Sequence, residues 1–186
     1  SINPNAEPHV GRARNALIGD SIVRLLRFNG YKTETHYYVN DIGKQIAMLV
    51  LAANGKKPRF HELINLYINI NKKLEKDPSI EKKVFELLNK LEKGSKKVRK
   101  QFNDIVEICV KGQSSILEEL GIKYDAFDYE SKYLFNKDCE NLLKELAKTG
   151  KLFTDNENRQ VLDLRGYLPE ESAYFVLTRA DGTSLY

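Results

Sequence analysis

The chain has 186 residues, of which 41% are hydrophobic and 30% are charged, and its net charge at pH 7 is +4. This length suits one domain, or one domain that carries an insertion. No apolar run approaches the ~18 residues that a membrane-spanning helix needs, and no signal-peptide pattern opens the chain. Cys109 and Cys139 fit neither a disulfide framework nor a zinc-binding spacing. These features exclude membrane-spanning and disulfide-scaffold classes, and we expect a cytoplasmic protein.

The positive charge is concentrated in one part of the chain. Residues 56–111 contain 15 Lys and Arg against 8 Asp and Glu, whereas the remainder has more acidic than basic residues. A phosphate-backbone partner would favour such a basic segment. A solvated helix surface rich in Lys and Glu is the alternative interpretation, and the composition leaves both open.

The first predicted elements are a helix, a strand and a second helix. Residues 10–28 carry apolar side chains at near-helical spacing, and Gly30 suits the stop that follows. Residues 32–39 alternate and are rich in Thr and Tyr, which indicates a strand. Asp41 is placed to cap the next helix, which we expect to run to about Ala53. Alternating strands and helices are typical of a parallel α/β sheet.

The pattern changes at residues 54–58, and residues 60–120 are helical throughout. Breaks fall at residues 77–79 and at residues 94–95, and at the first of them either Asp77 or Ser79 suits a helix cap. The economical interpretation is a helical hairpin inserted into an α/β fold.

Mixed structure is expected after Gly121. Residues 122–131 indicate a strand and a loop, and residues 136–148 indicate a helix that ends at Gly150. Three short strands separated by turn signals follow, with the sequences KLFT, RQVLDL and YFVLTR.

The start of the first predicted helix is the strongest candidate for a ligand site. Unpaired backbone N–H groups and the positive end of the helix dipole collect there, and such a terminus binds phosphate readily. His9 and Arg12 place side-chain donors on this turn, and Gly11 allows a ring or a phosphate close to the backbone. The alternatives are a capping or surface histidine and an ordinary Asn-Pro turn before it.

Other polar residues carry weaker signals. His36 and His61 are isolated, which is typical of surface or satisfied structural histidines. Asp125, Asp128 and Glu130 form a carboxylate cluster without a partner at metal-ligand spacing, so a solvated loop is the preferred interpretation. The sequence contains neither a Walker-type loop nor a complete G-x-G-x-x-G fingerprint.

Three sequence blocks resemble one known family. HVGRARNALIGD (9–20) is similar to the His-x-Gly-His motif of class I aminoacyl-tRNA synthetases, and more narrowly of arginyl-tRNA synthetase. THYYVNDIGKQIA (35–47) resembles the segment that follows that motif. FVLTRADGTSLY (175–186) resembles the stretch that brings the arginine-recognition tyrosine into the pocket. One block alone would also fit other nucleotidyl transferases, whereas three blocks in this order favour the arginyl enzyme.

The resemblance implies an α/β fold with a partial Rossmann-like parallel sheet and a helical connective insertion. Residues 1–55 would then form the first part of the nucleotide-binding core. Residues 56–121 would form the helical insertion, and residues 122–186 a connective segment and the return to the core.

The resemblance also implies the ligands and the residues that bind ATP. ATP, accompanied by Mg²⁺, arginine and tRNA(Arg) would be the partners. His9 would hold ATP and the developing charge on its α-phosphate, with Gly11 beside it. Arg12 stands where the family has a second histidine. A guanidinium can pair bidentately with phosphate oxygens, or it could turn away to a salt bridge with Asp20 or with another acidic partner.

For arginine, the resemblance implies three contacts. Ser1 and Asn3 match residues that bind the backbone end of the substrate. Tyr186 matches the tyrosine that packs beside the substrate guanidinium, an attraction on the order of 1 kcal/mol.

Two interpretations from different classes follow. The first is part of an arginine–tRNA ligase, which activates arginine with ATP and esterifies it to tRNA(Arg). The second is a non-catalytic tRNA-binding or interaction module built on the basic helices. No Lys-Met-Ser-Lys-Ser-like loop occurs before the last residue, so we expect these residues by themselves to be inactive. A sheet edge left uncovered would also allow self-association.

Overall fold

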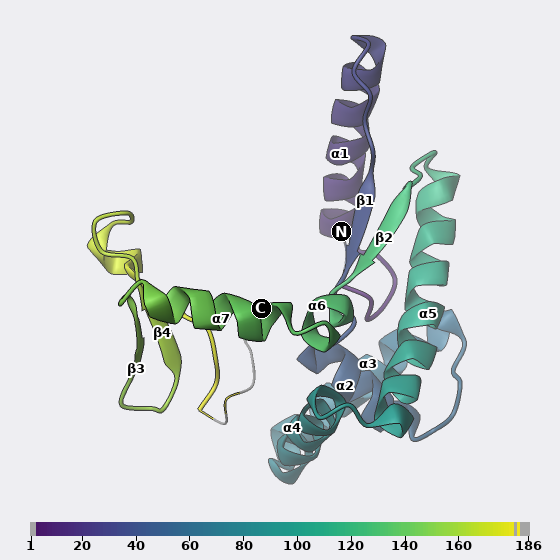
Figure 1. Ribbon diagram of the computed structural model, residues 1–186. Helices are drawn as coiled ribbons and strands as arrows, with labels where there is room; N and C mark the ends of the chain where they lie inside the picture. Colours follow the sequence, from purple (N-terminus) through teal and green to yellow (C-terminus); the bar gives the residue numbers. More distant parts are fainter. Residues whose placement is uncertain (1–2, 181, 183–186) are drawn as a thin grey trace. The chain divides into compact units, whose positions relative to one another are not determined.

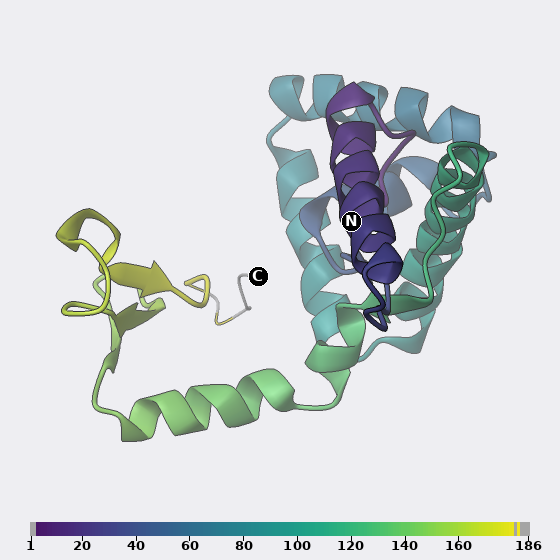
Figure 2. The same ribbon diagram turned by 90° about the horizontal axis from the view of Figure 1, so that it is seen from above.

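The structure is a computed structural model that describes residues 3–180 and 182. Its elements fall into two units, divided between Lys132 and Tyr133, and each unit is treated by itself. The first contains a parallel pair of strands with most of the helices, the second contains one longer helix and an antiparallel sheet, and a short helix, Ser131–Phe135, crosses the division (Figures 1 and 2). The predicted α/β class is confirmed.

Helix α1 (Val10–Phe28) and strand β1 (His36–Val39) begin the first unit. Strand β1 pairs in parallel with β2 (Ala126–Tyr129), in a register that places His36 opposite Ala126. The helix matches the predicted range, and the strand is shorter than the predicted one. The pairing joins segments on either side of the helical region, which is the parallel arrangement that the alternation indicated.

Four helices of the first unit pack together between these strands in sequence. Helix α2 packs against three others, which are α3, α4 and α5. Their bounds are α2 (Lys44–Ala53), α3 (Leu63–Lys76), α4 (Ser79–Glu92) and α5 (Lys96–Glu119), with the 3-10 turn η1 (Phe60–Glu62) before α3. Every residue from Ile46 to Val50 is buried. Because α2 is apolar on all sides, it lies in the core of this group.

The helical region, residues 60–119, contains one helix more than the predicted hairpin. The chain breaks at both predicted places, between α3 and α4 and again between α4 and α5, so three helices are present where a hairpin has two. Pro78 precedes the first helical residue of α4, so neither Asp77 nor Ser79 is its cap; the Asp77 carboxylate accepts a hydrogen bond from the backbone N–H of Ser79 (2.9 Å) from one position further out. Gly94 has a φ of +78°, a conformation that glycine adopts without strain.

The predicted role of Asp41 as the cap of α2 is wrong. Gly43 is the residue that precedes the first helical residue, and no side chain caps this end. The Asp41 carboxylate instead accepts a hydrogen bond from the backbone N–H of Ser131 (2.8 Å), at the start of the short helix α6 (Ser131–Phe135). Since β1 and β2 are parallel, the residues that follow both strands lie at the same end of the pair, and this brings Asp41 to Ser131.

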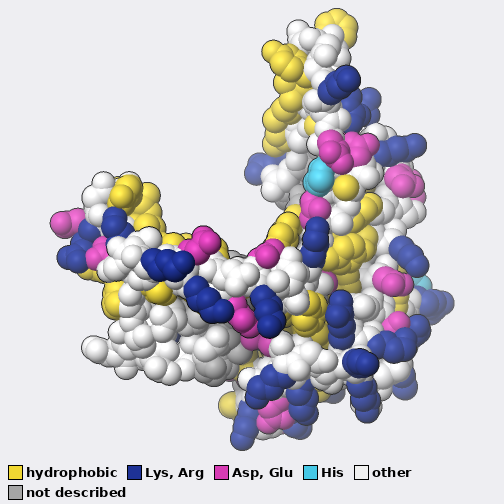
Figure 3. All heavy atoms as spheres, in the orientation of Figure 1, with side chains coloured by type: hydrophobic (Ala, Val, Ile, Leu, Met, Phe, Trp, Pro, Cys, Tyr) yellow, Lys and Arg dark blue, Asp and Glu magenta, His cyan; other side chains and the backbone are white. Residues whose placement is uncertain are grey.

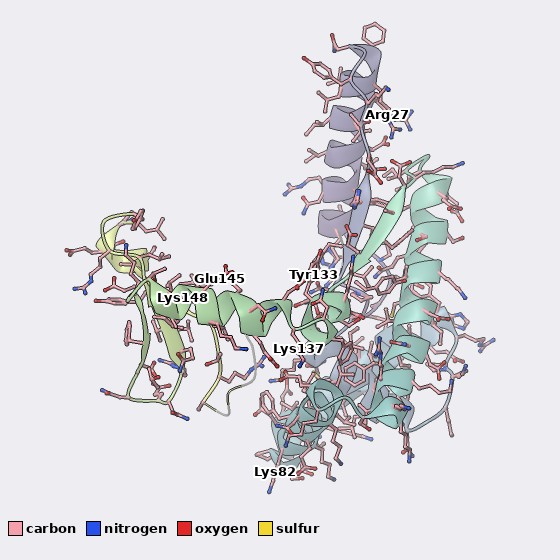
Figure 4. All side chains as sticks on the ribbon, viewed as in Figure 1. Arg27, Lys82, Tyr133, Lys137, Glu145 and Lys148 are labelled. Carbon is pink, nitrogen blue, oxygen red and sulfur yellow. The ribbon has the colours of Figure 1, made fainter. Side chains whose placement is uncertain are left out.

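In the second unit, helix α7 (Asp138–Lys148) contacts a small antiparallel sheet. The strands lie in the order β3-β4-β5, so each pairs with its neighbour in sequence. They are β3 (Leu152–Thr154), β4 (Gln160–Asp163) and β5 (Tyr174–Val176), and the 3-10 turn η2 (Glu170–Ser172) precedes β5. The predicted helix and the three predicted strands are confirmed. Figure 4 labels Lys137, Glu145 and Lys148 in and beside α7.

Helix α1 carries a row of exposed apolar side chains. Ala16 is its one buried residue. Figure 3 shows yellow side chains along one side of this helix. The exposed large apolar residues of α1 are Val10, Leu17, Ile18, Ile22, Leu25, Leu26 and Phe28. Contiguous apolar surface of this kind marks a contact surface. Within the described parts of the chain, no helix is long and apolar enough to cross a membrane.

Candidate nucleotide site

The first turn of α1 presents backbone donors. His9 precedes the helix in an extended conformation and makes no side-chain cap, and the first turn contains no acidic residue. The backbone N–H groups of Arg12 and Ala13 donate to the carbonyl of His9, at 2.9 and 3.0 Å. The N–H groups before them point outward along the helix axis, where the dipole is positive. An anion would therefore be stabilised at this end of α1.

The imidazole of His9 lies over Gly11. A Cβ atom placed on Gly11 would come within 3.3 Å of Cε1 and Nδ1 of the imidazole. The side chain of His9 is otherwise exposed. The absence of a side chain at Gly11 thus lets the ring fold back over the helix start, beside the free backbone donors.

Arg12 is held by an amide. Its Nη1 donates to Oδ1 of Asn5 at 2.8 Å. Asn5 is buried, with 3% of its surface exposed. The alternative salt bridge between Arg12 and Asp20 is not formed, because Asp20 pairs with Arg24 at 2.6 Å. The guanidinium therefore stays next to the turn that contains His9.

Two glutamines fix the loop that leads to His9. The Oε1 of Gln45 in α2 accepts hydrogen bonds from the side-chain amides of Asn5 (2.9 Å) and Asn3 (3.3 Å). Nε2 of Gln113 in α5 donates to the carbonyl oxygens of Asn3 (3.0 Å) and Ala6 (2.7 Å). The hydroxyl of Tyr37 donates to Oε1 of Gln113 at 2.6 Å. The loop is therefore anchored to a helix of the helical region as well as to α2.

Sequence reasoning missed Gln45 and Gln113. Gln113 is fully buried and lies four residues from Cys109 and four from Leu117, both of which are buried on α5. A polar residue within an apolar helical stripe is the signal that could have revealed it, because a buried amide needs hydrogen-bonding partners.

The structure places the candidate arginine contacts unequally. Asn3 is described, lies in the fixed loop and is exposed to solvent. Ser1 and Tyr186 lie outside the described residues. The predicted contacts of both therefore stay predictions.

A pair of carboxylates lies at the carboxyl ends of the parallel strands. Asp41 follows β1 and is 4% exposed, and Glu130 follows β2. Burial, and then the negative charge of Asp41, raise the pKa of Glu130, while a hydrogen bond from the Tyr38 hydroxyl acts in the opposite direction. Ligands bind at this end of parallel strands in open α/β sheets. A cation placed here would relieve the repulsion between the two carboxylates.

The predicted solvated loop for the acidic cluster is wrong for Asp128, whereas Asp125 and Glu130 lie just before and just after the strand. Asp128 lies within β2, and its carboxylate is 2.6 Å from Nδ1 of His36 on the neighbouring strand. Asp125 accepts hydrogen bonds from the backbone N–H and the hydroxyl of Thr35, at 2.8 and 2.7 Å. Arg27, labelled in Figure 4, approaches the same carboxylate at 3.2 Å. Pairing between the two strands therefore uses these acids, which is also why His36 is a satisfied structural residue.

The chain belongs to the class I tRNA synthetases. The family model described as "tRNA synthetases class I (R), catalytic domain" matches residues 1–186. Arginine–tRNA ligases are similar along the whole chain: the enzyme of Methanocaldococcus jannaschii is 39% identical over 196 residues, and that of Methanothermobacter thermautotrophicus 38% over 195 residues. The arginyl-tRNA synthetase of Thermus thermophilus superposes with a TM-score of 0.73 at 29% identity, covering the whole chain.

The chain spans about a third of the length of these proteins. It covers 34% of both archaeal relatives and 32% of the Thermus thermophilus chain. The resemblance to arginyl-tRNA synthetase inferred from the three sequence blocks is confirmed, and it extends over the whole chain.

Proposed function

We propose that this chain forms part of an arginine–tRNA ligase, in which it binds ATP and arginine for the activation of arginine and its transfer to tRNA(Arg). The observation that carries the proposal is the turn of α1 where His9, Gly11 and Arg12 meet. Backbone donors, an imidazole and a guanidinium converge there. Such a group suits the phosphates of a nucleotide. The family and the relatives support this assignment.

The role proposed for these residues is electrostatic. Attack of the arginine carboxylate on the α-phosphorus of ATP releases pyrophosphate and increases the negative charge on the phosphate oxygens. Donors fixed in advance, such as His9 and Arg12, stabilise that charge without reorganising. The chain supplies position and charge, and no covalent intermediate with the protein is required.

Arginine brings two positive groups to the site, its α-amino group and its guanidinium, and the described residues offer one pair of carboxylates, Asp41 and Glu130, as a partner for either group. Asn3 would bind the backbone end of the substrate, together with Ser1. We propose that Glu130 and Asp41 add the negative charge that a substrate amino group or guanidinium requires, because they lie partly and almost fully buried at the ends of β2 and β1. Tyr186 would pack beside the guanidinium, as the family resemblance implies.

Mg²⁺ would enter with ATP. Among the described residues, no group of three or more His, Cys, Asp or Glu side chains could hold a metal ion. Mg²⁺ commonly keeps several waters and is held by substrate phosphates with one or two carboxylates. The donors at the start of α1 therefore fit a metal–nucleotide complex through its phosphates.

Exposed lysines support a contact with tRNA. Six exposed lysines without a salt bridge among the described residues lie on α4, directly after it and at the start of α5. They are Lys82, Lys83, Lys90, Lys93, Lys96 and Lys97. Figure 3 shows dark blue side chains in this part of the first unit, and Figure 4 labels Lys82 on α4. The same observation supports the second candidate, a non-catalytic tRNA-binding module.

Self-association, predicted from an uncovered sheet edge, is supported by a different feature, the row of exposed apolar side chains on α1. The predicted cytoplasmic location would follow from charging tRNA.

Arginine-dependent exchange of pyrophosphate into ATP separates the two candidates. The assay uses the longest native polypeptide that contains these residues, with each of the other amino acids as a control. Exchange that depends on arginine supports the ligase. Binding of tRNA, seen as a shift in gel mobility, without any exchange would support the interaction module instead.

A further inference from the structure

Arg12 differs from most arginines of the described chain in the group that holds it. Arg24, Arg27, Arg59, Arg159 and Arg165 pair with carboxylates. Arg12 donates to the uncharged amide oxygen of Asn5, and no ion pair of Arg12 with a carboxylate occurs among residues 3–180. A hydrogen bond to an amide orients a guanidinium without cancelling its charge.

The orientation of the Asn5 amide is itself determined by Gln45. Nδ2 of Asn5 donates to Oε1 of Gln45 at 2.9 Å. An amide group has its donor nitrogen and its acceptor oxygen on different sides. With Nδ2 directed to Gln45, Oδ1 is left to face Arg12. Asn5 is buried and both contacts are partly buried, so solvent competes little for its amide group.

We propose that Asn5, oriented by Gln45, is a positioning residue that directs the guanidinium of Arg12 and leaves its positive charge available to phosphate. The inference rests on the proposed function, since it assigns a purpose to Arg12 within the ATP site. One N–H of the guanidinium is used by Asn5, and the remaining donors stay free for phosphate oxygens. A carboxylate at position 5 would hold Arg12 as firmly but would neutralise it.

Two substitutions of Asn5 distinguish positioning from simple support. Asn5→Asp keeps an acceptor for Arg12, and Gln45 can turn its own amide to donate to the new carboxylate. Asn5→Ala removes the acceptor but leaves Arg12 charged. We expect Asn5→Asp to lower the rate of arginine-dependent pyrophosphate exchange at saturating arginine by about a hundredfold, and Asn5→Ala to lower it less. A purely structural role predicts the opposite order, because the ion pair in Asn5→Asp preserves the local structure better.

Two controls show whether a lower rate is due to the added charge alone or to a loss of stability. Asn69→Asp adds the same charge at an exposed position on α3 and should leave exchange unchanged. Thermal unfolding of each variant shows whether the lower rate follows lower stability. If Asn5→Asp does not fold, Gln45→Ala replaces it: freeing the Asn5 amide should lower the rate by a larger factor in the parent than in an Arg12→Ala background, where only the loss of the loop anchor remains.

The outcomes separate this inference from the function on which it rests. Exchange in the parent with equal rates in Asn5→Asp and Asn5→Ala, or with the reverse order, overturns the positioning role and leaves the ligase intact. A loss of the same size for Gln45→Ala with and without Arg12 also overturns it. Absence of exchange in the parent overturns the proposed function itself.

Discussion

The ring of Phe60 occupies the space where Gly112 would carry a side chain. A Cβ atom built on Gly112 would lie 2.2 Å from Cγ of Phe60 and 2.4 Å from both Cδ atoms. Gly112 belongs to α5, and Phe60 opens the turn η1 that leads into α3. The two residues fix how closely the segment that leads into α3 approaches α5.

Gly112→Ala should therefore destabilise the protein, although alanine favours helix formation. We expect a loss of about 1–3 kcal/mol in the free energy of unfolding, because the added methyl group would overlap the ring at Cγ and both Cδ atoms, so that Phe60 or the helix backbone has to shift. Gly19→Ala is the matched control: it lies in α1 with no atom within 4 Å of the added Cβ, and it should stabilise by up to about 1 kcal/mol. Urea denaturation of the two variants measures both effects. Equal shifts in the same direction would contradict the close contact.

Tyr37→Phe should weaken the anchor of the loop before His9. The substitution leaves Oε1 of Gln113 buried without its donor, which costs about 1–3 kcal/mol. Tyr31→Phe, at a tyrosine that is 65% exposed, should change stability little. Thermal unfolding compares the pair. We also expect faster hydrogen exchange at Asn5 and Ala6 in Tyr37→Phe, and unchanged exchange there would show that Gln113 holds the loop alone.

Arg12→Ala should lower the rate of arginine activation and leave the affinity for arginine nearly unchanged. The expected loss is about 10²–10³-fold, because the contact is to phosphate oxygens whose charge changes most in the transition state. Arg12→His should recover part of the loss. Arg12→Lys should restore only part of the activation rate of the parent, since an ammonium keeps the charge but lacks the planar fork that binds two phosphate oxygens. Pyrophosphate exchange with separate kcat and KM values tests the series, and an unchanged rate in Arg12→Ala would give Arg12 a structural or surface role only.

Glu130→Gln should raise the KM for arginine more than it lowers kcat, because the proposed contact is to a positive group of the substrate and not to the reacting phosphate. Steady-state pyrophosphate exchange measures both constants.

Glu130→Gln should also be more stable than the parent when no ligand is bound. Burial and Asp41 raise the pKa of Glu130 above its ordinary value of 4.5. A carboxyl whose pKa is raised by folding opposes folding once the pH exceeds the unfolded pKa. The stability difference between the variant and the parent should therefore grow as the pH rises through 4.5 and then level off above the folded pKa. A stability difference between variant and parent that does not change with pH would contradict a raised pKa of Glu130.

The contact between His36 and Asp128 should make the pairing of β1 with β2 depend on pH. Hydrogen bonding to Asp128, and then the charges of Asp128 and Glu34, raise the pKa of His36 above its ordinary value of 6.5. A histidine whose pKa is raised by folding stabilises the protein fully below its unfolded pKa, and this stabilisation disappears as the pH rises through the folded pKa. Asp128→Asn should thus lower the pKa of His36, as measured in an NMR titration. The variant should be less stable than the parent below the unfolded pKa of 6.5, and the difference in stability should shrink as the pH rises through the folded pKa. A pKa of His36 equal in both proteins would exclude the interaction.

Several parts of the fold could be predicted because their signals are local. The bounds of α1 follow from apolar spacing within the helix and from Gly30 just after it, whose φ is +85°. The helix breaks at residues 77–79 and 94–95 follow from residues that cannot continue a helix well. The motif around His9 is also contiguous, so the family resemblance could be inferred from the residues alone.

The sequence by itself thus determined the helices, the strands, the family and the turn expected to bind phosphate. Tertiary structure alone decided which side chains support that turn. Gln113 reaches Ala6 across 107 positions, and Asp41 reaches Ser131 across 90. Propensity and periodicity describe neighbours along the chain, whereas these partners are chosen by how the strands pair and how α5 packs. The neutral acceptor of Arg12 belongs to the same class, because only the fold turns the amide of Asn5 toward it.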